Sequence, residues 1–424
     1  MLTPDQVITL TIDKPAAGGR MIARVDGQVV LVSGAIPGET VRARIERVGK
    51  GVVYAETINL EAPSIDRRTP AADPLCGGCL YSHIAYSRQL AIKGQVIADA
   101  FGRIGRLPLT APPAVMASPP DGYRMRARLH VRGRRIGFVR EGTHDVCDAR
   151  PTGQLLPATC DTLDGLGAAM QSLGLDAIHD VELSENIEAS ERVVFLDTAS
   201  DIDARAVERL AGTEGLTGLV SPFASHGSAH VTDRMTIAGG VSVALRRHVL
   251  AFFQGNRHLL AALVAHVVGQ LPEGGDVLDL YAGVGLFAAS AAAARGAQVT
   301  AVEGDRFAAA DLAANASGGV GSVTAVHQPV EDFVRRARRD RQPSSRHASA
   351  VIVDPPRTGL SRAALDGVVS LSPGRLIYVS CDVATLGRDA RRIVDAGYAM
   401  ERIDAFDMFP NTPHVETVVV FART

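Results

Sequence analysis

Alternating strand and helix patterns fill the chain from about residue 249 onward. Short apolar runs typical of buried strands are each followed by a helical pattern, as in DVLDLYAG, QVTAVEGD, SAVIVDPP and RLIYVSC. Repeated units of this kind predict a doubly wound, mostly parallel α/β sheet with helices on both faces. Ligands bind such sheets at the carboxyl ends of the strands, so residues that end these strands are the first candidates for function.

The remaining chain divides by pattern into two further regions. In residues 5–60, five short strand patterns separated by glycine-containing turns predict a small OB-like β-barrel. Prolines then interrupt the pattern, and a helix is predicted over 85–105 before mixed α and β patterns. We therefore expect three domains: the barrel (1–60), a central α+β region (61–240), whose helix over 85–105 can pack on the last domain, and the α/β domain (241–424).

The composition of the chain excludes several classes of protein. Of 424 residues, 46% are apolar and 21% are charged, and no unbroken apolar run reaches the length of a membrane span. The first residues lack the basic and then apolar pattern of a signal peptide, so we expect a cytoplasmic protein without a membrane partner. We also expect it to be a monomer. The net charge of −2 excludes a uniformly basic protein. Five cysteines are too few for a disulfide scaffold of this size.

One basic segment stands out within that balanced charge. The run GYRMRARLHVRGRRIGFVR (122–140) contains seven Arg and no acid. Arg124, Arg126 and Arg128 alternate with apolar residues, so on a strand they share one face. An edge strand blunted by charge has this pattern, but the absence of acids favours contacts with the phosphates of a nucleic acid.

The motif DLYAGVG (Asp279 to Gly285) ends an apolar strand in a glycine-rich turn that opens a helix. Glycines such as Gly283 and Gly285 let a backbone approach a ligand closely. Glu303 ends the next strand, about 20 residues later, where an acid can bind ribose hydroxyls. The spacing D-x-x-x-G-x-G differs from G-x-G-x-x-G and so disfavours a dinucleotide.

Three more residues end or begin strands at the same predicted edge. Asp354 precedes two prolines in VIVDPPR, and Cys381 ends the strand in LIYVSC. A lone cysteine is usually a small buried hydrophobe, but a helix that starts directly after it helps to stabilise a thiolate nucleophile. Glu416, near His414, begins an apolar strand and is either a solvated strand end or a proton acceptor.

Taken together, these motifs resemble the RNA 5-methyluridine methyltransferase family, which depends on S-adenosylmethionine. The resemblance rests on DLYAGVG, DPPRTGL, SCD, MFPNTPHVET and FFQGN (252–256), with CGGCLYSH and GYRMRARLHV in the central region. Residues 1–60 resemble the TRAM domain of that family, an RNA-binding barrel of OB type. The resemblance covers nearly the whole chain and implies a Rossmann-like methyltransferase sheet.

The resemblance also implies roles for the residues. Cys381 would add to C6 of uracil, C5 would accept the methyl group, and Glu416 would remove the C5 proton. The cofactor site would be formed by Gln254, Tyr281, Gly283, Gly285, Glu303 and Asp354; Gln254 and Asp354 are equally placed to hold the base. The target base must leave its stack, and Arg124, Arg126 and Arg128 would bind RNA. A TRAM domain favours rRNA over tRNA as the partner.

The cysteines depart from the family pattern. Many members bind a [4Fe-4S] cluster through C-x5-C-x2-C and one distant Cys. Cys76 and Cys79 match the last two positions of the triplet, but Pro70 stands at the first. A complete cluster would have to recruit Cys147 and Cys160. The alternative is a C-x-x-C turn without metal.

Other functions fit the motifs less well. A 5-methylcytosine RNA methyltransferase would carry a Cys in the Asp354 segment, and an amino-group methyltransferase would carry an aromatic residue at Arg357. A non-catalytic RNA-binding module with a vestigial sheet would not need Cys381 and Glu416. The glycine spacing disfavours an NAD dehydrogenase.

Overall fold

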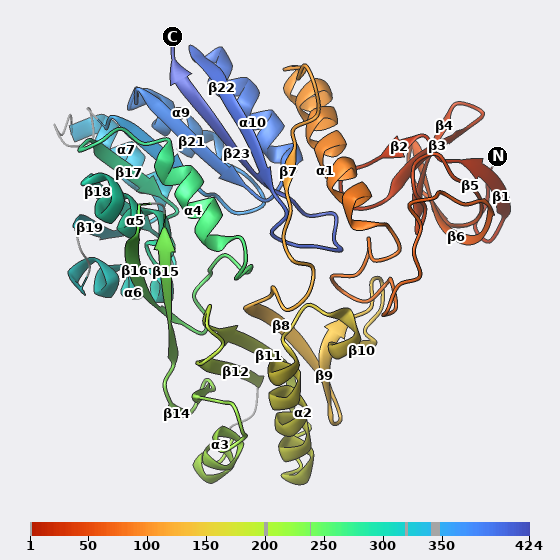
Figure 1. Cartoon of the computed structure of the whole chain (residues 1–424), viewed down its shortest axis with the longest axis horizontal. Helices are drawn as coiled ribbons and strands as arrows, with labels where there is room; N and C mark the ends of the chain where they lie inside the picture. Colours follow the sequence, from red (N-terminus) through yellow and green to blue (C-terminus); the bar gives the residue numbers. More distant parts are fainter. Residues whose placement is uncertain (1, 199–201, 238, 319–320, 341–347) are drawn as a thin grey trace.

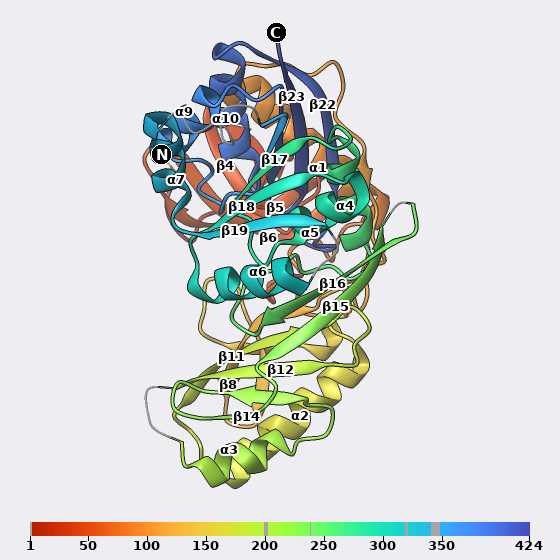
Figure 2. The ribbon, with the colours of Figure 1, turned by 90° about the vertical axis from the view of Figure 1, so that its left-hand side faces the viewer.

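The computed structural model describes residues 2–198, 202–237, 239–318, 321–340 and 348–424. Within them, strands form three larger sheets and one two-stranded hairpin. Figure 2 shows an elongated molecule, with the central sheet at one end and the C-terminal sheet at the other. The N-terminal sheet lies beside the C-terminal one (Figure 1). In the described part of the chain, no helix has the length and apolar character needed to cross a membrane.

Six strands form the N-terminal sheet, in the order β1-β5-β6-β4-β3-β2. They are β1 (Val7–Thr11), β2 (Lys14–Pro15), β3 (Met21–Val25), β4 (Gln28–Ser33), β5 (Thr40–Val48) and β6 (Val52–Ala62). Alternate residues of β5, Val41, Ala43 and Ile45, are fully buried, as expected for a strand with one face on a core. The strand-rich N-terminal region is thus confirmed. The strand pairs described do not include a closure of this sheet, so the OB-like barrel stays a prediction.

The central sheet has the order β10-β9-β8-β11-β12-β13-β14. Its strands are β8 (Arg126–Arg132), β9 (Arg135–Val139), β10 (Val146–Asp148), β11 (Ile178–Glu185), β12 (Arg192–Thr198), β13 (Gly218–Val220) and β14 (Ser225–Gly227). Helices α2 (Pro157–Ser172) and α3 (Ala204–Ala211) and the 3-10 turn η2 (Arg150–Thr152) accompany it. The hairpin of β15 (His230–Ile237) and β16 (Val241–His248) then leads to the C-terminal sheet.

The C-terminal sheet has the order β19-β18-β17-β20-β21-β23-β22-β7. Its strands are β7 (Val115–Met116), β17 (Asp276–Leu280), β18 (Gln298–Glu303), β19 (Ser322–His327), β20 (Ala350–Val353), β21 (Arg375–Ser380), β22 (Tyr398–Phe406) and β23 (Glu416–Arg423). The helices between them are α4 (Leu260–Gly269), α5 (Leu286–Arg295), α6 (Arg306–Gly318), α7 (Val330–Asp340), α9 (Arg362–Ser370) and α10 (Val383–Asp395). Only β23 runs antiparallel to its neighbours among these described strands, so the predicted mostly parallel α/β sheet is confirmed.

Both faces of this sheet are covered, which is the defining feature of a doubly wound fold. Along β20, Val351 and Val353 pack with buried residues of α7, α9 and α10. Ala350 and Ile352 point to the opposite face and pack with α4, α5 and α6. The strand therefore reads as a continuous apolar run because each alternate residue enters a different core.

The C-terminal sheet also takes up part of the predicted central region. Helix α1 (Tyr86–Ala100), which continues into the π-helical turn η1 (Phe101–Gly105), packs beside α10 and β7 (Figure 1). A Cβ on Gly105 would lie only 2.8 Å from the carbonyl oxygen of Gly387, so the two helices cross at a glycine contact. The proline-rich segment that follows η1 contributes β7, which pairs with the edge strand β22.

Candidate active site

Three of the predicted site residues meet at one edge of the C-terminal sheet. Asp354 directly follows β20, Cys381 directly follows β21, and Glu416 is the first residue of β23. Ser380 pairs with Thr417 across the antiparallel strands. Cys381 and Glu416 therefore occupy the next opposed positions, and β20 ends beside them because it runs parallel to β21. The predicted strand positions of these residues are confirmed.

Gln254 reaches the same edge from the loop that precedes α4. Its Nε2 donates a hydrogen bond to Oδ2 of Asp354 at 3.2 Å. Burial raises the pKa of Asp354 to about 7, with the Gln254 hydrogen bond opposing the shift and Glu303 adding to it. The sequence predicted both residues for the site, and the structure brings them into contact.

Cys381 is half-buried in an acidic environment. Burial, then the nearby Glu416 and Asp354 carboxyls, raise the pKa of the Cys381 thiol to about 12, and Arg357 opposes them. We expected the start of the next helix to favour a thiolate, but burial and the acids outweigh it. A cation brought into the site would shift this balance towards the thiolate.

Glu416 is not a solvated strand end. Only 2% of its surface is exposed, and its Oε1 has no hydrogen-bond partner among the described residues. Burial, followed by Asp354, raises the pKa of Glu416 well above its usual value, while Arg357 opposes the shift. A buried carboxyl oxygen without a partner costs free energy, which suits a group that receives a proton from a ligand.

The glycine turn after β17 has the geometry expected of a ligand-binding loop. Gly283 and Gly285 have φ angles of 57° and 95°, and a Cβ on Gly285 would lie 2.8 Å from Cδ1 of Leu312. The backbone N–H of Gly283 donates to Oε2 of Glu303 at 2.8 Å. Tyr281, also at positive φ, donates its hydroxyl to Glu331 of α7.

Asp279 is a site candidate that the sequence reasoning did not single out. It is fully buried at the end of β17, and both carboxyl oxygens lack a hydrogen-bond partner among the described residues. Burial, then Asp354, raises the pKa of Asp279. The sequence did contain an indication of this residue, because Asp279 is the first residue of the DLYAGVG motif. Buried acids beside a glycine turn fit S-adenosylmethionine, which carries an ammonium and a sulfonium group.

The three predicted RNA-binding arginines lie on one face, because Met125, Ala127 and Leu129 between them are buried. Arg126 lies 3.8 Å from Glu182 and Arg128 lies 2.6 Å from Asp180, both on the neighbouring strand β11. The segment is therefore less positive than its own sequence indicated, since the next strand partly neutralises it.

Arg124 and Phe252 make further contacts in this region. The guanidinium of Arg124 donates to Gln154 at 2.6 Å and lies 5.3 Å from the centre of the Phe138 ring. Phe252, two residues before Gln254, is 61% exposed, and the guanidinium of Arg126 lies 5.9 Å from its ring. An exposed aromatic ring of this kind is not visible in a sequence, because exposure depends on the fold.

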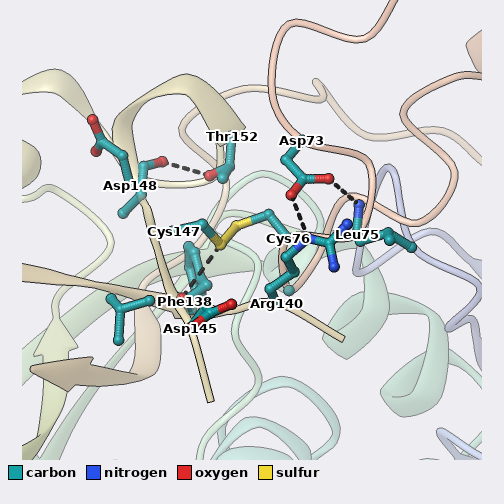
Figure 3. Close-up of a disulfide and its surroundings, with 12 residues drawn as sticks. Asp73, Leu75, Cys76, Phe138, Arg140, Asp145, Cys147, Asp148 and Thr152 are labelled. Atoms are coloured by element: carbon teal, nitrogen blue, oxygen red, sulfur yellow. Dashed lines mark hydrogen bonds and ion pairs between the residues drawn. A yellow bond between two sulfur atoms is a disulfide. The ribbon is translucent and has the colours of Figure 1, made fainter. Parts of the chain in front are cut away.

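The cysteines correct the metal prediction. Cys76 forms a disulfide with Cys147, 71 residues away, so it is not a free thiolate ligand (Figure 3). Cys79 and Cys160 are free and buried. Within the described residues, no group of three or more His, Cys, Asp or Glu side chains is arranged to hold a metal ion. These residues do not fit a four-thiolate iron–sulfur cluster.

Comparison with protein families and relatives agrees with this geometry. A family model described as tRNA (uracil-5-)-methyltransferase matches residues 226–424, and a TRAM domain model matches residues 3–58. The chain is 32% identical to a 23S rRNA (uracil(1939)-C(5))-methyltransferase RlmD of Halomonas elongata, over 97% of this chain and 88% of the relative. It is 31% identical to the RlmD of Pseudomonas putida, over 97% and 93%.

A solved structure shares the fold over almost the whole chain. The Pyrococcus abyssi tRNA (uracil-54, C5)-methyltransferase, in complex with S-adenosyl-L-homocysteine, superposes with a TM-score of 0.75 at 24% identity. The match covers 97% of this chain and 99% of that one. The chain therefore belongs to the family of S-adenosylmethionine-dependent RNA uracil-C5-methyltransferases, with an N-terminal TRAM domain.

Proposed function

We propose that this protein methylates C5 of a specific uridine through a covalent bond between Cys381 and C6 of the base. The observation that supports it is the placement of Cys381 and Glu416 at opposed positions of β21 and β23, with Asp354 and Gln254 hydrogen-bonded beside them. A nucleophile and a proton acceptor within one site are what this reaction needs, because uracil C5 is a poor nucleophile by itself.

In this mechanism Cys381 is the nucleophile and Glu416 is the proton acceptor. The Cys381 thiolate forms a bond to C6, and the electron pair of the C5–C6 double bond moves onto the base as an enolate. When bound, S-adenosylmethionine would supply an electrophilic methyl group for C5 and keep the electron pair of the broken S–CH3 bond on its own sulfur. Glu416 then takes the C5 proton, and the electron pair of that C–H bond restores the C5–C6 double bond. The C6–S bond breaks in the same step, and the thiolate leaves with its electron pair.

Cofactor and base recognition follow from the remaining residues. We assign Tyr281, Gly283, Gly285 and Glu303 to the cofactor, with Asp279 as an added partner for its ammonium group. Gln254 and Asp354 lie between this turn and Cys381, where either can contact the cofactor or the base. Phe252 is placed to stack against an unpaired base, a common mode of RNA recognition.

The RNA-binding surface combines the TRAM domain with the arginine face. We infer that the N-terminal sheet (1–60) closes into an OB-like barrel and, with the central region (61–240), contacts phosphates through Arg124, Arg126 and Arg128. The catalytic domain (241–424) then acts on the flipped base. Since the two RlmD relatives compared above are named for 23S rRNA, we propose rRNA as the substrate. We further propose a cytoplasmic monomer as the active form.

Two variants test the mechanism, and a third experiment tests the substrate. Cys381→Ala should abolish transfer of tritiated methyl groups to RNA while leaving cofactor binding intact, and Glu416→Gln should trap a protein–RNA adduct on a denaturing gel. Transfer at the rate of the unmodified protein by Cys381→Ala would refute the mechanism. Mapping 5-methyluridine in rRNA and tRNA from a deletion strain identifies the substrate; loss from tRNA alone would refute the rRNA assignment.

A further inference from the structure

The loop between β22 and β23 leads directly into Glu416. It starts at Asp407, turns at Asn411 with a φ of 63°, and returns to the sheet where Glu416 pairs with Phe406. Because both ends of the loop are opposed on adjacent strands, a shift of the loop moves the start of β23. The position of the Glu416 carboxyl therefore depends on what holds this loop.

Helix α1 contacts the loop through two residues on one face, Gln89 and Lys93. They are four residues apart, so they lie on successive turns of the helix. Gln89 donates to Oδ1 of Asn411 at 3.0 Å and accepts from the backbone N–H of Asn411 at 3.0 Å. Lys93 donates to Asp407 at 2.5 Å and to the carbonyl oxygen of Phe409 at 3.1 Å.

These contacts are unusual because the charged and polar side chains of Lys93, Asp407 and Gln89 are buried. The side chains of Lys93 and Asp407 are both 0% exposed, and Gln89 is also 0% exposed. A buried ion pair is often no more stabilising than well-packed apolar residues of similar size. Its advantage is directional, since Lys93 fixes a carboxyl oxygen and a backbone carbonyl at the same time.

The opposite side of the loop is held by the segment that carries Gln254. Asn256, two residues after Gln254, donates from Nδ2 to the carbonyl oxygen of Met408 at 3.1 Å. The loop is thus bound by α1 on one side and by the Gln254 segment on the other. Asn411 lies five residues before Glu416, and Asn256 lies two residues after Gln254.

We propose that Lys93, with Gln89, positions the loop so that Glu416 meets the C5 proton of the methylated base. Lys93 is a positioning residue, because it touches Asp407 and Phe409 rather than the substrate. This inference rests on the proposed covalent mechanism. Displacing Glu416 slows the step that follows methyl transfer, and because the C6–S bond breaks only with that step, the covalent adduct persists longer.

The test compares substitutions of two basic residues on α1 and its continuation η1. Lys93→Met removes the buried contact, whereas Arg103→Met breaks the exposed pair between Arg103 and Asp99 at the other end of α1. With RNA and S-adenosylmethionine, Lys93→Met should lower kcat by about 10- to 100-fold, leave KM for RNA almost unchanged and raise the steady-state fraction of protein–RNA adduct. Arg103→Met should leave all three unchanged.

A second variant separates positioning from folding. Lys93→Met with Asp407→Asn leaves no uncompensated buried charge, so it should melt close to the unmodified protein while its adduct fraction stays high. Recovery of kcat together with stability, or a fall in kcat without adduct accumulation, would overturn the inference. If Glu416→Gln itself traps no adduct, the covalent mechanism has failed; if it does and the Lys93 variants do not, only the positioning role has failed.

Discussion

Removing the covalent bond between Cys76 and Cys147 should destabilise the central region measurably. The bond joins the segment that precedes α1 to β10, and noncovalent contacts surround it (Figure 3). Arg140 pairs with Asp73 at 2.9 Å, and the backbone N–H of Gly77 donates to the carbonyl oxygen of Val139 at 3.0 Å. These contacts remain after reduction, so the loss isolates the cross-link itself.

The magnitude follows from the length of chain that the bond closes. With a separation of 71 residues, the cross-link removes about 15 cal/mol/K of entropy from the unfolded chain, or about 4 kcal/mol at 25 °C. For a cooperative unit of 150–250 residues this lowers the melting temperature by about 8–16 °C. Burial raises the pKa values of Cys79 and Cys160 to about 11, so neither supplies much thiolate to reshuffle the bond.

The assay is a thermal melt with and without a phosphine reductant, on the unmodified protein and on the Cys76→Ala, Cys147→Ala double variant. The reductant should lower the melting temperature of the unmodified protein and leave that of the double variant unchanged. Thiol titration of the denatured, unreduced protein should find three thiols, corresponding to Cys79, Cys160 and Cys381. Five reactive thiols, or equal melting with and without reductant, would refute the reasoning.

Three further predictions concern the active-site edge. Glu416→Gln should raise the free energy of unfolding at about pH 8 by on the order of 1 kcal/mol or more, seen as a higher melting temperature, and should change it little at about pH 4. The reason is that a carboxyl whose folded pKa is raised costs the protein stability as pH rises past the unfolded pKa of that carboxyl. An equal gain at both pH values would contradict this. Alkylation of Cys381 by iodoacetamide, followed by mass spectrometry, should rise about tenfold per pH unit without a plateau below about pH 10. Gly285→Ala should lower stability by about 1 kcal/mol or more and weaken cofactor binding in calorimetry, and unchanged affinity and melting would count against the assigned turn.

Sequence reasoning placed the candidate site residues at one sheet edge because the relevant signals are local. An apolar run followed by Asp354 or Cys381 marks the end of a buried strand wherever the other strands lie. The sheet then brings such ends together, since parallel strands share one carboxyl edge. The placement of Glu416 opposite Cys381 follows from the same pattern once β23 is known to return antiparallel.

What the sequence did not show depends on residues far apart in the chain. Glu182 and Asp180 neutralise part of the arginine face from another strand, and no window around residues 122–140 contains them. The disulfide joins cysteines 71 residues apart, and Lys93 and Asp407 are separated by 314. Local periodicity carries no information on such pairs, because any of many partners would satisfy the same helix or strand pattern.

The strand that carries the arginines is joined directly to the loop that carries Gln254. The backbone N–H of Met125 donates to the carbonyl oxygen of Gly255, and that of Arg257 donates to the carbonyl oxygen of Tyr123, both at 2.9 Å. The side chain of Arg257 then pairs with the buried Glu185 of β11. The strand that carries the arginines and the loop that carries Gln254 are thus held together by two backbone hydrogen bonds and a buried ion pair. On the RNA-binding role that we propose for the arginines, we expect a phosphate contact that displaces this strand to displace Gln254 as well, and with it the hydrogen bond to Asp354.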